Sequence, residues 1–117
     1  MRPMFLNELD VRAVDDGYML LHEFRYITMH GNHERLISVP EGFVTNFASV
    51  PAAARAFISG HGRDRWAATV HDYLYSQKYA RHEADAIFLE ALEISKVGWL
   101  KRHAMYRAVR LAGWMFH

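Results

Sequence analysis

The chain has 117 residues, of which 51% are hydrophobic and 14% aromatic, and none is cysteine. This length suits a single domain over residues 1–117 with a core of its own, and the apolar content excludes a disordered chain. The lack of cysteine excludes disulfides, thiolate nucleophiles and Cys-ligated metal sites. The formal net charge of +1 argues against nucleic acid as a partner.

The N-terminal segment predicts no export signal, because Asn7, Glu8 and Asp10 interrupt its apolar residues. No apolar run approaches the roughly 20 residues that a membrane-spanning helix needs. We therefore expect a soluble protein without a membrane span.

The first half of the chain has the pattern of short strands separated by turns. The turn signals are Asp15-Asp16-Gly17, the polar residues at 30–33, and Pro40-Glu41-Gly42. The strands that we expect between them cover residues 9–14, 18–28 and 36–39, with 43–45 as an extension. The simplest arrangement of these strands is one small antiparallel β-meander.

Beyond Pro51 the spacing of apolar residues changes to the period of a helix. The helices that we expect cover residues 52–58, 64–77, 83–95 and 99–114. Strands followed by helices predict an α+β fold, in which three to four packed helices cover one side of the sheet.

An adjacent pair of ionisable residues, His71 and Asp72, lies in an apolar stretch of the second expected helix. Ionisable side chains among apolar residues are tolerated when they are paired, hydrogen-bonded or metal-bound. Imidazole and carboxylate suit zinc or manganese, and such a metal would need further ligands from elsewhere in the chain. The candidates for these ligands are Asp85, Asn46, His61 and His82.

A structural interpretation of the same residues stays open. His71 would bond a strand carbonyl while Asp72 accepts hydrogen bonds from the loop at residues 46–49, and the pair would be a buried polar anchor. Asp85 has a local alternative, because Arg81 precedes it by four residues and the two could brace the start of a helix.

The last expected helix has basic and aromatic residues along one side. These residues are His103, Arg107, Arg110, Trp99, Tyr106 and Trp114. Such a line is usually a solvated helix face. Trp, Tyr and Arg also dominate protein–protein hot spots, so a protein partner stays open.

Four ordered blocks are the most specific feature of the sequence. They are residues 39–51 (VPEGFVTNFASVP), 67–75 (AATVHDYLY), 81–88 (RHEADAIF) and 105–110 (MYRAVR). With them the chain, from about residue 18 to residue 114, resembles domain-of-unknown-function family 1353, which is found in tailed bacteriophages and prophages. The resemblance implies a phage or prophage origin and brings no established activity.

One residue departs from the pattern of that family. An Asp usually follows the Thr of the first block, whereas this chain has Asn46. The change removes one negative charge from any metal site that includes this position.

Two functions are consistent with these residues. In the first, a zinc or manganese ion held by His71, Asp72 and Asp85 or Asn46 activates a water molecule, and the protein is a hydrolase acting on the cell envelope. Tyr75 or Ser49 would orient the substrate.

In the second function, the same residues are a structural polar network. The protein would then be a non-catalytic virion, tail-assembly or host-interaction factor whose partner is a phage or host protein. Either function places the protein in the cytoplasm of the infected bacterium or in the virion.

Overall fold

The computed structural model describes residues 2–56, 58 and 62–116, and it has an α+β fold. The helices in these residues are α1 (Ala52–Arg55), α2 (Asp64–Ser76), α3 (Arg81–Ile94) and α4 (Trp99–Phe116). The strands are β1 (Met4–Phe5), β2 (Val11–Val14), β3 (Gly17–Leu20), β4 (Phe24–Thr28), β5 (Arg35–Val39) and β6 (Val44–Thr45). In the described residues, no helix combines the length and the apolar character needed to cross a bilayer.

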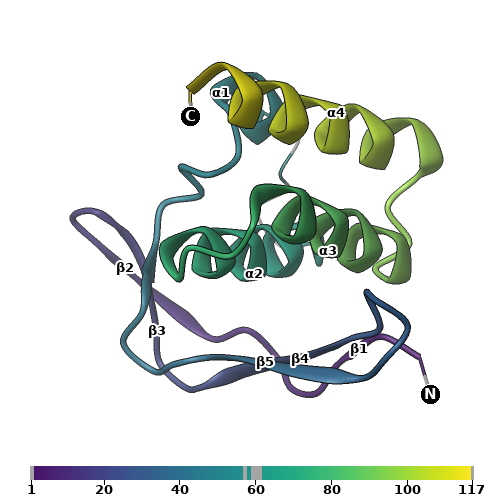
Figure 1. Cartoon of the computed structure of the whole chain (residues 1–117). Coiled ribbons are helices and arrows are strands. Elements are labelled where there is room, and N and C mark those ends of the chain that lie inside the picture. Colours follow the sequence, from purple (N-terminus) through teal and green to yellow (C-terminus); the bar gives the residue numbers. More distant parts are fainter. Residues whose placement is uncertain (1, 57, 59–61, 117) are drawn as a thin grey trace.

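The elements form three layers (Figure 1). The strands form the lower layer, α2 and α3 lie side by side above them, and α4 with the short α1 lies on top. The helices thus cover one side of the strands, as the order of elements in the sequence predicts.

The described strands pair in two antiparallel sheets, with the orders β1-β4-β5 and β2-β3-β6. The expectation of a single meander is therefore wrong. The strand expected over residues 18–28 is broken at residues 21–23, where the chain passes from one sheet to the other. The chain returns to the second sheet between β5 and β6. A hydrogen bond from the Leu20 N–H to Phe43 O, 2.9 Å long, joins the two places where the chain changes sheets.

Three long helices, α2, α3 and α4, make the helical part of the core, and each lies within a few residues of its predicted span. The predicted first helix is shortened to the single turn α1. Beyond its end, the Ile58 N–H donates to Arg55 O at 3.0 Å. The described part of the chain therefore has three packed helices, where three to four were predicted.

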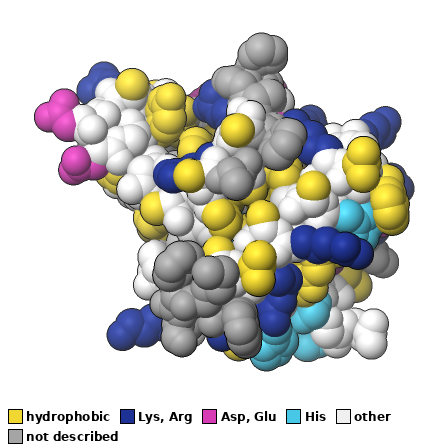
Figure 2. Space-filling model, turned by 90° about the horizontal axis from the view of Figure 1, so that it is seen from above, with side chains coloured by type: hydrophobic (Ala, Val, Ile, Leu, Met, Phe, Trp, Pro, Cys, Tyr) yellow, Lys and Arg dark blue, Asp and Glu magenta, His cyan; other side chains and the backbone are white. Residues whose placement is uncertain are grey.

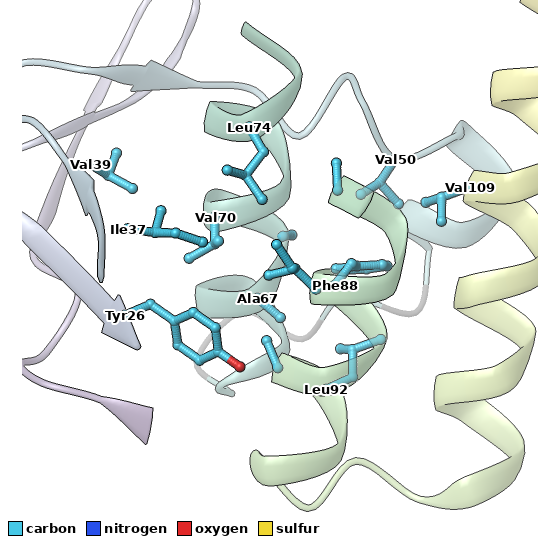
Figure 3. Close-up of a cluster of buried hydrophobic side chains, with 14 of the residues drawn as sticks. Tyr26, Ile37, Val39, Val50, Ala67, Val70, Leu74, Phe88, Leu92 and Val109 are labelled. Atoms are coloured by element: carbon cyan, nitrogen blue, oxygen red, sulfur yellow. The ribbon is translucent and has the colours of Figure 1, made fainter. Parts of the chain in front are cut away.

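The hydrophobic core extends from the strands through the middle helices to α4 (Figure 3). Tyr26, Ile37 and Val39 face α2 from the strands, and Leu74 of α2 and Phe88 of α3 lie on the helical side. Each of these side chains is at most 5% exposed. Full burial of a large apolar side chain stabilises the fold by about 1.5–3 kcal/mol, so this cluster holds the sheet and helix layers together.

Glu90 of α3 adds a polar contact between the same layers. Its carboxylate accepts hydrogen bonds from the Tyr26 hydroxyl at 2.7 Å, the Thr28 hydroxyl at 2.8 Å and the Met29 N–H at 3.1 Å. Burial raises the pKa of Tyr26, and the hydrogen bond and charge of Glu90 raise it further. Tyr26 is therefore a hydrogen-bond donor at any ordinary pH, and Glu90 fixes the end of β4 to α3.

Gly17 allows β6 to approach β3 closely. It has a φ of +145°, and a Cβ on it would lie 2.4 Å from the carbonyl oxygen of Thr45. A side chain at this position would therefore push β6 away. The close approach matters because Thr45 is the residue from which the chain reaches across to α2.

Candidate functional site

The loop that follows β6 is held against α2 by the carboxylate of Asp72. Asp72 Oδ2 accepts hydrogen bonds from the Thr45 hydroxyl at 2.6 Å and the Phe47 N–H at 2.9 Å, and Oδ1 accepts from the Ser49 N–H at 2.9 Å. The Ser49 hydroxyl also donates to Oδ1. Phe47 has a φ of +60°, and this left-handed conformation costs about 1–2 kcal/mol. The bonds to Asp72 offset that cost and fix the shape of the loop.

His71, the neighbour of Asp72 on α2, joins the loop to α3. Its Nδ1 lies 2.8 Å from Ser49 Oγ, and its Nε2 lies 2.7 Å from Asp85 Oδ1. The side chains of His71 and Asp85 have no solvent exposure. Both ring nitrogens of His71 are therefore engaged inside the protein.

Asp85 receives two further hydrogen bonds, from the Tyr75 hydroxyl and the Arg110 guanidinium, each at 3.0 Å. Burial alone would raise the pKa of Asp85, but the hydrogen bond and charge of His71, with the hydrogen bonds of Tyr75 and Arg110, outweigh burial and lower it. Asp85 is therefore ionised at neutral pH. Arg110, on α4, is 42% exposed and carries the network to the surface.

Tyr75 has the opposite shift, because burial followed by the charge and hydrogen bond of Asp85 raises the pKa of its hydroxyl. Its ring also lies against the ring of His71, with centroids 4.4 Å apart. Tyr75 is thus a neutral donor that supports the Asp85 carboxylate.

The hydroxyl of Ser49 donates its one proton to Asp72 Oδ1, and its oxygen also lies within hydrogen-bond distance of His71 Nδ1. Because Asp85 is ionised, His71 Nε2 carries a proton toward it. Ser49, His71 and Asp85 therefore form a continuous proton path, an arrangement that activates serine in many hydrolases.

The structure brings five of the six predicted site residues into one network, which are Ser49, His71, Asp72, Tyr75 and Asp85. The prediction that Asp72 accepts hydrogen bonds from the loop is confirmed. The expectation that His71 bonds a strand carbonyl is wrong, because its ring lies between two side chains.

The sixth predicted site residue, Asn46, does not join the network. It is exposed, and its Oδ1 accepts a hydrogen bond from the Ala48 N–H at 2.8 Å. The other two candidate ligands also fall elsewhere, since His82 is exposed on α3 and His61 lies outside the described residues.

The predicted ligands do not fit a zinc or manganese ion in this arrangement. Metal binding takes a lone pair from a ring nitrogen, and both ring nitrogens of His71 already face protein partners. The oxygens of Asp72 accept four hydrogen bonds from the loop. Over residues 2–56, 58 and 62–116, no group of three His, Asp or Glu side chains could hold a metal.

Arg110 is the residue of the network that sequence reasoning missed, because its spacing on α4 assigned it to a solvated face. The pairing of Asp85 with Arg110 also replaces the predicted local pair with Arg81. A buried carboxylate needs a cation or several donors, and this need could have pointed to a distant arginine. The side chain of Trp114, from the same predicted line, lies outside the described part of the chain.

Comparison with known protein families gives a match over residues 18–109 to the family described as "Protein of unknown function (DUF1353)". Comparisons with curated proteins and with solved structures gave no match. The family match runs from β3 into α4 and contains all six predicted site residues. It covers more than half of the sequence, and the chain therefore belongs to the DUF1353 family.

Proposed function

We propose that this chain is a non-catalytic interaction protein, and that the polar network around His71 is its structural centre. The role would be that of a virion, tail-assembly or host-interaction factor of a phage or prophage. The phage setting rests on the resemblance of the four sequence blocks to a family of such proteins. The observation that carries the structural role is that His71, Asp72 and Asp85 direct their polar atoms at protein partners.

The backbone of the loop supports the same interpretation. The N–H groups of Phe47 and Ser49 donate to Asp72, that of Ala48 donates to Asn46, and that of Val50 donates to the Phe47 carbonyl. Acyl transfer needs donors directed at the developing oxyanion. The N–H groups beside Ser49 are all used to hold the loop.

The network also joins parts of the chain that are far apart in sequence. It connects the loop after β6 with α2, α3 and α4 through Asp72, His71 and Arg110. Removing one partner from a buried ion pair destabilises a protein by about 3–5 kcal/mol. A network of this kind is well suited to keep a small domain rigid while its surface binds a partner.

The proposal is tested with a fluorophosphonate probe, which forms a covalent bond with an activated serine. We expect no labelling of the wild-type protein at Ser49, and we expect an antibody to detect the protein in purified phage particles or bound to a tail component. Ser38 is a matched control, because its hydroxyl also bonds a carboxylate, Glu23, at 2.6 Å. Labelling that is lost in Ser49→Ala and kept in Ser38→Ala would overturn the proposal.

A second candidate function is a serine-dependent hydrolase that acts on the cell envelope without a metal. One observation favours it, namely the proton path from Ser49 Oγ through His71 to Asp85. In such an enzyme His71 would accept the Ser49 proton during attack, and Asp85 would orient the imidazole. Labelling of Ser49 that is also lost in His71→Gln, with the fold retained, would select this function over the first.

A further inference from the structure

Helix α4 has an excess of basic over acidic residues. This helix carries Lys101, Arg102, Arg107 and Arg110 and has no acidic residue. The whole chain has 14 basic and 13 acidic residues, so ten basic residues face 13 acidic ones outside α4, a net charge of −3 against +4 on the helix. A net charge of +1 thus conceals a polarised molecule.

The surface on the α4 side shows this distribution (Figure 2). Lys, Arg and His side chains lie among hydrophobic ones across this face, and acidic side chains gather at its left edge. That edge is the end of the molecule where the turn between β2 and β3 lies in Figure 1, and this turn contains Asp15 and Asp16.

A second apolar stripe runs along α4 on the side away from the core. Met105 and Val109 on the inner side are fully buried, whereas Leu100 and Leu111 are 77% and 58% exposed. Ala104 and Arg107, which are also exposed, lie between these two leucines. The spacing of four, three and four residues places the outer stripe, Leu100, Ala104, Arg107 and Leu111, on one line. This line is about 16 Å long.

The surface is shallowly hollowed at the start of the outer stripe. A hollow of about 280 Å³ is lined by Trp99, Leu100, His103, Ala104 and Arg107, and one of about 550 Å³ lies along residues 98–104. Trp99 is 64% exposed, and its ring lies 4.8 Å from that of His103. Exposed tryptophan and arginine beside leucine are typical of a binding hot spot.

We infer that the outer stripe of α4 binds an acidic amphipathic helix of a partner protein. This inference rests on the proposed interaction function and names the partner's chemistry. The apolar face of the partner helix covers Leu100, Ala104 and Leu111, as in helix-in-groove recognition. Asp or Glu residues beside that face pair with Arg107, whereas Lys101 and Arg110 are already paired with Asp64 and Asp85 within the chain.

Other occupants suit this stripe less well. A second copy of the chain would bring together two α4 helices of the same charge, which repel. A membrane would have to take the guanidinium of Arg107, in the middle of the stripe, toward its hydrocarbon. A nucleic acid would meet Leu100 and Leu111, which neither stack on bases nor bond phosphates.

The test is a selection from a yeast-displayed library of 18-residue helical peptides, which match α4 in length. The leucine spacing is fixed, and the flanking positions are randomised between Glu and Lys. We expect Glu-rich peptides to be enriched. Leu100→Ser and Arg107→Glu should each weaken binding of the selected peptide by at least about tenfold.

Two exposed residues outside α4 supply matched controls, Leu36 on β5, which is 56% exposed, and Arg12 on β2. Leu36→Ser and Arg12→Glu should change the affinity by less than about twofold. Circular dichroism of each variant checks that the fold is retained.

Enrichment of Lys-rich peptides, or of peptides that bind Leu100→Ser and Arg107→Glu as well as the wild type, would overturn the inference. Binding to phosphatidylglycerol vesicles or to a DNA duplex that is stronger than binding to the selected peptide would also overturn it. So would self-association of the chain that Leu100→Ser abolishes. Labelling of Ser49 by the fluorophosphonate probe would instead overturn the proposed function and leave the peptide result intact.

Discussion

His71 Nε2 lies 2.7 Å from Asp85 Oδ1, and neither side chain is exposed to solvent. The two residues are 14 positions apart and join α2 to α3. Ser49 extends this contact to the loop after β6, and Arg110 extends it to α4. Breaking a buried pair is costly because the partner that remains stays buried without an opposite charge or a hydrogen bond.

Replacing His71 by Ala should destabilise the protein by about 3–5 kcal/mol, because Asp85 would stay buried with one donor fewer. Urea unfolding of the variant measures this loss. The control is His22→Ala, since His22 is 69% exposed and lies 3.8 Å from Asp10. That change should cost less than about 1 kcal/mol. Equal effects of the two substitutions would contradict a structural role for His71.

Asp85 should make the stability of the protein fall in acid. Its pKa is lower in the folded protein than the ordinary value of 3.8, so the folded state binds this proton less tightly than the unfolded state. The stabilisation is complete above about pH 5 and is lost as the pH falls through the folded pKa. In urea unfolding at about pH 6 and pH 3, the wild type should lose more stability than Asp85→Asn. A parallel loss in both proteins would assign the acid sensitivity to other carboxylates.

Asp72→Ala should release the loop after β6. The substitution removes four hydrogen bonds at once, and the left-handed Phe47 loses the donor–acceptor contacts that offset its cost. Amide hydrogen exchange should become faster at Phe47 and Ser49. At Ser49 it should also be faster than in Thr45→Val, which loses only the hydroxyl bond to Asp72 and a longer contact with the Phe47 N–H at 3.3 Å. Unchanged exchange at these two amides would show that the loop is held by other contacts.

Zinc, manganese and a chelator should leave the melting temperature of the protein unchanged, because His71 has no free ring nitrogen. A ligand that binds only the folded state would raise this temperature. Asn46→Asp, which places a carboxylate at this position, should likewise give no rise in melting temperature with zinc. A rise in melting temperature with zinc that His71→Gln abolishes would contradict the arrangement of the network.

Gly17→Ala should destabilise the protein by more than about 1 kcal/mol, because the new Cβ would meet Thr45 O at 2.4 Å and because φ is positive. Gly98→Ala is the control, since no atom outside Gly98 and its two neighbours in the chain lies within 4 Å of its added Cβ. The control should cost less than about 1 kcal/mol, since it changes only the residue before the first turn of α4. Thermal melting of the two variants makes the comparison, and similar melting temperatures would contradict the close approach of β6.

Local signals predicted the helices well. Pro51 and the apolar period identified the helical half, and the ends of α2, α3 and α4 lie within a few residues of their predicted positions. The single meander was wrong because a composition rich in β-branched and aromatic residues favours strands without reporting where the chain bends. The bend at residues 21–23 depends on long-range contacts, such as that of Leu20 with Phe43.

The residues that belong to the site were predicted better than the hydrogen bonds and ion pairs between them. The apolar surroundings of His71 indicated that it needs partners, and the four blocks indicated which parts of the chain converge. The partner of Asp85 could not be predicted, because Arg81 and Arg110 are equally suitable as cations and only the packing of α4 on α3 decides between them. Glu90 gave no local signal because its three donors are more than 60 residues away.

The carboxylates of Glu90 and Asp72 both bind the helical half of the chain to the strand half. Glu90 connects α3 to β4, and Asp72 connects α2 to the end of β6. A strand half expressed alone would lack the acceptors of the Tyr26, Thr28 and Thr45 hydroxyls, and a helical half alone would leave the half-buried carboxylates of Glu90 and Asp72 without these donors. Neither fragment would be an autonomous folding unit. The two halves should instead unfold in a single cooperative transition, so a truncated chain is a poor reagent for locating the binding surface.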